Sequence, residues 1–385
     1  MDFAFTEAQT QLQKDVRAWA ERELRPHVWA WEDRDELPWE AVRTMGAEGL
    51  LGFTLPERVG GKGRGFLDFA IVLEELGRLG GGLWALPYFN NLYGRIIDDD
   101  DFLRGLVTGE NVIAFAETEP HSGGDAAAIR TTAVRQGEFY VLNGGKTQIS
   151  LVPGANWLLV TALTNPAAGG KRGMSMFLLE ADTPGVKITA TREPGMKSHK
   201  YGQIGFRDVR VPVSRLVGEE NRGFYQMRSR WDYTRSVGPT ADIGNAQGAL
   251  EATIEWAKRK KTFGKPLLKW QYIQFKLNDA VVALETARLL AYKAAWLADQ
   301  GQRVTAHASM CKLFVGAAVE KVHRDCLEIV GGRAYNEQHH IWRRFAGCLG
   351  PRLWGGGSGI HHIILGVELF GREYATHRDQ GADRS

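Results

Sequence analysis

The sequence predicts a mainly α protein with a central β domain, in the order helical, β, helical. Apolar residues recur every three or four positions in the first third of the chain and again, over longer segments, after Gly223. Short β-rich runs separated by turns lie between these two regions. The 385 residues, 44% of them hydrophobic, suffice for a large buried core. We therefore expect three units, at residues 1–111, 112–222 and 223–385.

The first unit is expected to consist of helices. Thr6 and Gln9 match a capping box, and Leu12 and Val16 follow at helical spacing. A second amphipathic run covers residues 66–79 and stops in three consecutive glycines.

The second unit reads as a small β domain. Its β-rich runs and turns alternate along residues 129–134, Gln136-Gly137, 139–142, Asn143-Gly144, 157–163 and 174–179. The third unit returns to helical spacing, at Leu277, Val281, Leu284, Ala287, Ala291 and Ala294 and then at Met310, Phe314 and Ala317. Long amphipathic helices in succession predict a helical bundle.

Composition excludes several classes of partner. The 48 Lys and Arg residues nearly balance the 45 Asp and Glu residues, so we expect neither a nucleic-acid nor a membrane partner. The chain has no stretch of about 18 apolar residues and no cationic segment followed by an apolar one at its N-terminus. We therefore expect a cytoplasmic protein.

The residues that commonly bind metals show no metal-binding pattern. Cys311, Cys326 and Cys348 lack the paired spacing of zinc or redox motifs, as expected for a reducing compartment. The pairs His339-His340 and His361-His362 point apart on a helix, and no carboxylate or cysteine completes a set. We expect no metal site.

Five segments, in order along nearly the whole chain, resemble landmark motifs of the FAD-dependent acyl-CoA dehydrogenases. They are residues 117–125 (ETEPHSGGD), 140–146 (YVLNGGK), 206–212 (FRDVRVP), 261–266 (KTFGKP) and 329–332 (IVGG). The resemblance implies an N-terminal helical domain, a small β-barrel or sandwich and a C-terminal four-helix bundle. It also implies desaturation of an acyl-CoA thioester, in which a carboxylate takes the α-proton and flavin takes the β-hydride.

The same resemblance implies the positions that bind FAD and substrate. The β-domain positions for the flavin are Thr118, Gly123, Gln148 and Ser150. The positions for the pyrophosphate and adenosine end, partly contributed by a neighbouring subunit, are Lys260, Phe263, Gln271, Glu328, Gly331 and Gly332. Asp232 and Arg235 match a helix that lines the acyl-CoA pocket.

The sequence departs from the family at both positions where its members carry the catalytic Glu. Gly355 occupies one position and Thr234 the other. Neither residue replaces a carboxylate, whose general-base assistance is worth about 10²–10⁴ in rate. Asp232 is the nearest acid in sequence, although its position resembles that of a binding residue.

Cofactor and carrier positions depart as well. Gln148 stands where the family has an aromatic residue, Lys260 replaces an Arg, and Glu328 replaces a Gln. Lys cannot reproduce a bidentate guanidinium contact, and Glu328 adds negative charge near phosphates. The segment His199-Lys200-Tyr201 replaces the Ser-Asp-Thr that helps to hold CoA, and it could still bind an anionic carrier.

These departures lead to three hypotheses. In the first, the chain is the base-lacking subunit of a heteromeric acyl-CoA dehydrogenase that acts on bulky or steroid side-chain thioesters. A homologous partner in a tetramer then brings the base, and an electron-transferring flavoprotein accepts the electrons. The second is a flavin enzyme of another class on the same fold, such as a desulfinase or an oxygenase. The third is a non-catalytic assembly subunit.

Overall fold

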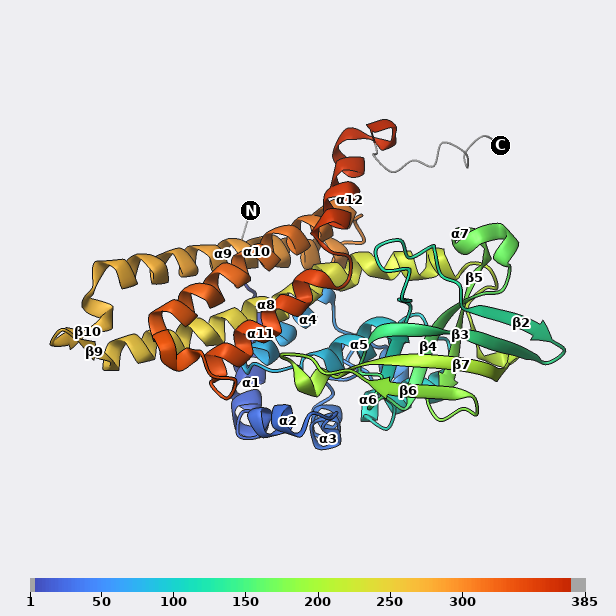
Figure 1. Cartoon of the computed structure of the whole chain (residues 1–385), viewed down its shortest axis with the longest axis horizontal. Helices are drawn as coiled ribbons and strands as arrows, with labels where there is room; N and C mark the ends of the chain where they lie inside the picture. The colour runs from blue at the N-terminus through green and yellow to red at the C-terminus, as the bar shows by residue number, and fades with distance from the viewer. Residues whose placement is uncertain (1–3, 375–385) are drawn as a thin grey trace.

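The computed structural model describes residues 4–374, and it confirms the order helical, β, helical (Figure 1). The first unit contains α1 (Glu7–Glu23), α2 (Val28–Arg34), α3 (Trp39–Ala47), α4 (Phe66–Arg78), α5 (Ala85–Gly94) and α6 (Asp100–Thr108). The capping box is present, because the Gln9 backbone N–H donates to Thr6 Oγ1 at 3.2 Å and the Thr6 N–H donates to Gln9 Oε1 at 3.1 Å. The predicted helix at residues 66–79 is α4.

The middle unit is one eight-stranded sheet with the strand order β6-β7-β3-β2-β4-β5-β8, and β1 pairs in parallel with β4. Its strands are β1 (Ile113–Ala116), β2 (Thr132–Gln136), β3 (Phe139–Ser150), β4 (Trp157–Leu163), β5 (Met174–Glu180), β6 (Val186–Ala190), β7 (Tyr201–Pro212) and β8 (Leu216–Val217). A short helix, α7 (Gly169–Gly173), joins β4 to β5.

The turn predicted at Asn143-Gly144 is wrong, because the pair lies inside β3. There β3 bulges against β7, with a register shift between Leu142 and Gly144. Glycine is required at position 144, because a Cβ atom there would lie 2.6 Å from Thr131 Oγ1 and φ is +143°.

The third unit is a bundle of long helices. Its helices are α8 (Gly223–Arg259), α9 (Gln271–Asp299), α10 (Thr305–Val330), α11 (His340–Leu353) and α12 (Ser358–Phe370). A hairpin, β9 (Lys261–Thr262) and β10 (Lys265–Pro266), joins α8 to α9 at the end of the bundle farthest from the sheet (Figure 1). Leu277, Leu284, Ala287 and their helical successors are buried as predicted, whereas Val281 is 47% exposed.

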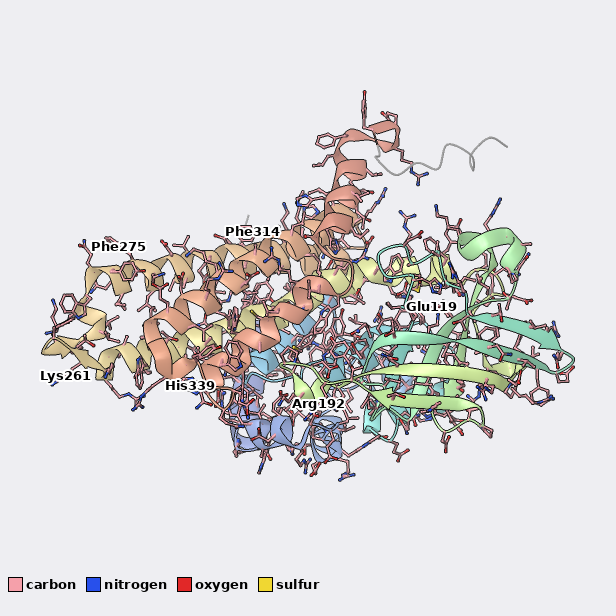
Figure 2. The ribbon with its side chains drawn as sticks, in the orientation of Figure 1. Glu119, Arg192, Lys261, Phe275, Phe314 and His339 are labelled. Carbon is pink, nitrogen blue, oxygen red and sulfur yellow. The ribbon has the colours of Figure 1, made fainter. Side chains whose placement is uncertain are left out.

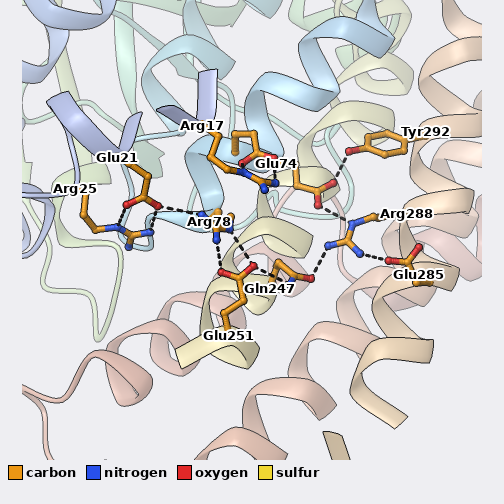
Figure 3. Close-up of polar contacts among 11 residues, drawn as sticks. Arg17, Glu21, Arg25, Glu74, Arg78, Gln247, Glu251, Glu285, Arg288 and Tyr292 are labelled. Carbon is orange, nitrogen blue, oxygen red and sulfur yellow. Dashed lines mark hydrogen bonds and ion pairs between the residues drawn. The ribbon is translucent and has the colours of Figure 1, made fainter. Parts of the chain in front are cut away.

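A polar network fastens the first unit to the bundle (Figure 3). Arg288 on α9 donates to the buried Glu74 carboxylate on α4 at 2.7 Å, and the Tyr292 hydroxyl donates to the other oxygen at 2.5 Å. Arg78 on α4 links Glu21 on α1, at 3.0 Å, to Glu251 on α8. The Arg78–Glu251 pair holds α4 against α8, which contributes six residues to the site described below.

The structure of residues 4–374 can be searched for a membrane-spanning helix and for a metal site, neither of which is expected from the sequence. In that range no helix is both long and apolar enough to span a bilayer. The same residues contain no cluster of three or more His, Cys, Asp or Glu side chains suited to a metal. The three cysteines are buried and unpaired.

Candidate functional site

A cavity of about 150 Å³ lies where the β domain meets α5, α8 and the end of α11. Aromatic side chains from α5 and its flanks, from β1, and from α8 and α11 form much of its wall: Trp84, Tyr88, Phe89, Tyr93, Phe115, Trp231 and Trp354. Polar groups converge on it from the β domain, α8 and α10: Glu117, Thr118, Gln148, Ser150, His199, Thr234, Arg235, Asp242 and Lys312. An apolar cavity with a few convergent polar groups is the usual form of a small-molecule site.

One face of α8 supplies six of the lining residues. Residues 231, 234, 235, 238, 239 and 242 are spaced by three or four, so they share one side of the helix. Pro239 has no N–H, so the Arg235 carbonyl lacks its helical donor. The interruption occurs in the part of α8 that borders the cavity.

Thr234 and Gly355, the positions at which the resemblance places the family's catalytic Glu, both line this cavity. Arg235 Nε donates to the Gly355 carbonyl at 2.9 Å, which ties the loop after α11 to α8. The Thr234 hydroxyl donates to the Trp231 carbonyl at 2.9 Å. Gly355 has φ +64°, and a Cβ added there would meet only Lys312 Nζ, at 4.0 Å. The space that a side chain at position 355 would occupy is therefore open, and no neighbouring residue fills it.

Glu117 places a carboxyl group in the same cavity. It follows β1 directly, and its Oε1 atom is buried without a hydrogen-bond partner among residues 4–374. Desolvation raises the pKa of Glu117 to about 7, although Lys146, Arg235 and a hydrogen bond with Trp231 favour the charged form. A carboxyl of this kind exchanges a proton readily near neutral pH.

A second carboxyl, on Asp242, faces a buried lysine. Burial raises the pKa of Asp242 to about 7, and Coulomb attraction to Lys312 opposes that rise. Burial lowers the pKa of Lys312 to about 8, and its Nζ also donates to the Pro351 carbonyl. Coulomb attraction therefore links the two groups, which come from α8 and α10.

His199 contributes unpaired polar atoms. Neither ring nitrogen has a hydrogen-bond partner in the described part of the chain, and burial lowers its pKa to about 3. Lys200 is buried too, and its Nζ is paired with Asp35 at 2.7 Å. The segment therefore offers an anionic carrier no free cation, because burial lowers the pKa of His199 and Lys200 is already paired with Asp35, and binding of a carrier here stays a prediction.

A buried ion pair holds the turn that presents Glu117 and Thr118. Lys146 on β3 donates to Glu119 Oε1 at 2.8 Å and to the Glu117 carbonyl at 2.9 Å. The Glu119 carboxylate also accepts from the Arg130 and Thr131 backbone N–H groups, at 2.7 and 3.0 Å. Coulomb attraction to Lys146 and these hydrogen bonds outweigh desolvation and lower the pKa of Glu119. The second glutamate of the motif, Glu119, thus helps to fix the backbone that carries the first, Glu117.

The cavity brings together three of the predicted flavin-binding residues of the β domain and one predicted substrate-binding residue. Thr118, Gln148, Ser150 and Arg235 all line it. Gly123 lies in the adjoining turn, where an added Cβ would meet nothing within 4 Å. Asp232 is absent from the lining, and its carboxylate accepts a hydrogen bond of 2.5 Å from the Thr305 hydroxyl.

The other predicted cofactor residues lie near the far end of the bundle. Figure 2 shows Lys261 in the hairpin at that end and Glu119 beside the β domain. Phe263 in the hairpin is 89% exposed. Glu328 near the end of α10 accepts from the Tyr272 hydroxyl at 2.6 Å and pairs with Lys276 at 2.9 Å, so its charge is already compensated. Within one chain, these residues and the cavity do not form a single site.

Sequence reasoning missed Glu117, Asp242 and Lys312 as lining residues, and it named His199 only within a segment that could bind a carrier. Glu117 had a readable signal, because an acid directly follows the apolar run Ile113–Ala116. Asp242 and Lys312 had none, since these residues are 70 positions apart and their electrostatic interaction depends on the packing of α8 with α10.

The comparisons with known proteins agree over the whole described chain. Three family models match: acyl-CoA dehydrogenase N-terminal domain at residues 6–99, middle domain at residues 114–209 and C-terminal domain at residues 221–370. The acryloyl-CoA reductase (NADH) of Anaerotignum propionicum is 33% identical over 383 residues, with 97% of each chain covered. The caffeyl-CoA reductase-Etf complex subunit CarC of Acetobacterium woodii is 32% identical over 379 residues, which cover 94% of this chain and 98% of the relative. The solved FAD complex of PigA superposes with a TM-score of 0.91 at 28% identity, covering 97% of this chain and 100% of PigA.

Proposed function

The chain belongs to the acyl-CoA dehydrogenase family, and from this membership we propose that it is an FAD-dependent oxidoreductase that introduces or removes the α,β double bond of an acyl thioester. One observation carries the proposal. A single cavity joins the β-domain positions Thr118, Gln148 and Ser150 to Arg235 and to both family positions for the base. Relatives named for acryloyl-CoA and caffeyl-CoA reduction support either direction of the reaction.

The residues present fit the flavin end of FAD. The cavity has aromatic walls for a planar ring and buried polar atoms that lack partners within residues 4–374, on Glu117 and His199. Leaving such atoms unpaired costs about 1–3 kcal/mol each, so a ligand with hydrogen-bonding groups is favoured there. Thr118 and Ser150 would hold the ring, which supplies hydride transfer when bound.

The chain's own residues position and isolate the thioester. Arg235 holds the Gly355 loop against α8 at 2.9 Å, and the aromatic residues of α5 exclude water from the cavity. Exclusion of water strengthens every electrostatic interaction inside.

A second subunit completes the cofactor site in this proposal. The predicted pyrophosphate and adenosine residues lie far from the cavity, and Phe263 is 89% exposed. Large apolar side chains also lie exposed on the outer faces of α9 and α10, among them Phe275 and Phe314 (Figure 2). These faces suit an interface with a homologous chain. Because Gly355 and Thr234 provide no carboxylate, the proton acceptor is either a carboxyl of a paralogous partner or another carboxyl of this chain.

Electron-transferring flavoprotein is the proposed electron partner, because a relative of similar length is a subunit of a reductase–Etf complex. The test uses the full chain, expressed alone and with any paralogue encoded beside it. Flavin absorbance in the purified protein, and its bleaching by butyryl-CoA or the reoxidation of reduced flavin by crotonyl-CoA, are the expected results. A protein that binds no flavin in either preparation contradicts the proposed function. Flavin binding and bleaching by the chain expressed alone contradict only the need for a paralogous partner.

A further inference from the structure

We propose that the Glu117 carboxylate is the group that takes the α-proton from the thioester and returns it in the reverse reaction. This assignment rests on the proposed function and names the proton acceptor that Gly355 and Thr234 cannot provide. It makes proton transfer a property of this chain's own cavity.

The position of Glu117 carries the assignment. Its carboxyl shares the cavity with Thr118 and Ser150 on one side and with Thr234 and Gly355 on the other. It is therefore enclosed with both places where relatives keep a base. The bracing of its backbone by Lys146, at 2.9 Å, and the hydrogen bond with Trp231 restrict where the carboxyl can move. A fixed carboxyl at the reacting centre is what proton transfer needs.

The hydrogen bonding and protonation of the Glu117 carboxyl also suit a proton acceptor. Oε1 is buried and has no hydrogen-bond partner within residues 4–374, so one oxygen is open to a proton from the ligand. Burial keeps part of the carboxyl population protonated near neutral pH, since its pKa is about 7. Such a group can both accept and donate a proton at the pH where the reaction must run.

The other candidate acids are committed elsewhere. Asp232 accepts a hydrogen bond from Thr305 and does not line the cavity. Asp242 lines it, but its charge faces the Lys312 ammonium. The lysine near Glu117 is Lys146, and its ammonium is already paired with the Glu119 carboxylate at 2.8 Å.

The step balances with the flavin of the proposed function as oxidant. In oxidation the α-carbon–hydrogen bond breaks, its proton forms an O–H bond on Glu117, and its electron pair becomes the α,β π bond. The β-hydrogen leaves with its two electrons as hydride to oxidised flavin. In reduction each of these bonds changes in the opposite sense.

The test measures exchange of the α-hydrogen with D₂O, which does not require hydride transfer. The FAD-loaded full-length protein is incubated with butyryl-CoA, and deuterium incorporation is followed by mass spectrometry for wild type, Glu117→Gln, Glu117→Asp and Asp242→Asn. We expect Glu117→Gln to slow exchange about 10²–10⁴-fold with FAD still bound, and Glu117→Asp to retain part of the rate. Asp242→Asn is expected to exchange faster than Glu117→Gln by at least tenfold.

The pH profile separates a proton acceptor from a structural residue. The charged and titratable groups facing Glu117 are Lys146 on β3, Arg235 on α8 and Tyr93 on α5. Wild-type exchange should rise with pH through about 7, because the charged carboxylate is the base. The Gln variant should lose this rise, and the Asp242→Asn variant should keep it. A second readout, the pH dependence of unfolding developed below, needs no catalysis.

Three results would overturn the assignment. They are exchange in Glu117→Gln within a few-fold of wild type, no exchange by wild type, and loss of exchange in Asp242→Asn but not in Glu117→Gln. If flavin is reduced equally fast in wild type and Glu117→Gln, the assignment fails while the proposed function stands. If butyryl-CoA and crotonyl-CoA leave the flavin unchanged in wild type, both fail.

Discussion

Replacing Glu117 by Gln should stabilise the protein at alkaline pH and leave its stability unchanged at acid pH. Desolvation raises the pKa of Glu117 from 4.5 to about 7 in the folded state. Between these two values the folded protein binds a proton that the unfolded chain has already released. Stability therefore falls as pH rises from about 4.5 to about 7, and the loss is complete above that range.

The shift sets an upper limit on the effect. A pKa difference of about 2.5 corresponds to about 3 kcal/mol of unfolding free energy, because each pKa unit is worth about 1.4 kcal/mol. If the 385 residues unfold together, their unfolding entropy is about 0.8 kcal/mol/K, so the variant should melt up to about 4 °C higher at pH 8. The gain should shrink through pH 7 and 6 and vanish near pH 4.5.

Differential scanning fluorimetry of the FAD-loaded protein at pH 5, 6, 7 and 8 checks this. Asp101→Asn is the control, because the Asp101 side chain is 92% exposed and its replacement should shift Tm by less than about 1 °C at every pH. A Gln variant that is no more stable than wild type at pH 8 would refute the reasoning. An equal difference at pH 5 and pH 8 would do so as well, since a titrating carboxyl cannot produce it.

Other predictions concern the Glu119–Lys146 ion pair, the base position at Gly355 and the exposed ring of Phe263. Glu119→Gln leaves the buried Lys146 ammonium without its counter-charge at 2.8 Å, so stability should fall by about 3–5 kcal/mol. A double variant, Glu119→Gln with Lys146→Met, should recover part of the lost Tm because it also removes the unpaired ammonium. A double variant that melts no higher than Glu119→Gln alone would contradict this. Gly355→Glu, added to Glu117→Gln, should restore part of the α-hydrogen exchange, because a Cβ there meets only Lys312 Nζ at 4.0 Å, while the φ of +64° costs about 1 kcal/mol. If mass spectrometry shows the double variant exchanging no faster than Glu117→Gln alone, the space at position 355 does not accommodate a working carboxylate. Phe263→Ala should leave Tm of the flavin-free protein unchanged, because the ring is 89% exposed, yet weaken FAD binding about tenfold in a fluorescence titration. An unchanged FAD affinity would exclude the hairpin from the cofactor site.

The order of units could be predicted because periodicity reports burial along single elements. The spacing at residues 66–79 became α4 almost residue for residue. Val281 shows the limit of this reasoning, because it continues the α9 repeat and is nevertheless 47% exposed. Periodicity identifies an apolar face without saying whether the same chain covers it.

The candidate site could be predicted only where a motif keeps its residues close in sequence or register. Thr118 and Ser150 line one cavity because β1, which Thr118 follows, and β3 belong to the same sheet. The burial of the Glu117 carboxyl depends on α8, more than a hundred residues away, so the motif alone gave no sign of it. The interior position of Asn143-Gly144 depends likewise on the partner strand β7.

Helix α8 gives this arrangement a mechanical consequence. It contains 37 residues, which at about 1.5 Å per residue make a rod of about 55 Å. One portion walls the cavity, and the opposite tip carries the hairpin with Phe263. In an assembly where that hairpin contributes to a neighbour's cofactor site, α8 connects the cavity of one chain directly to the cofactor site of the next. We therefore expect ligand binding in the cavity of one subunit to change FAD binding in its neighbour.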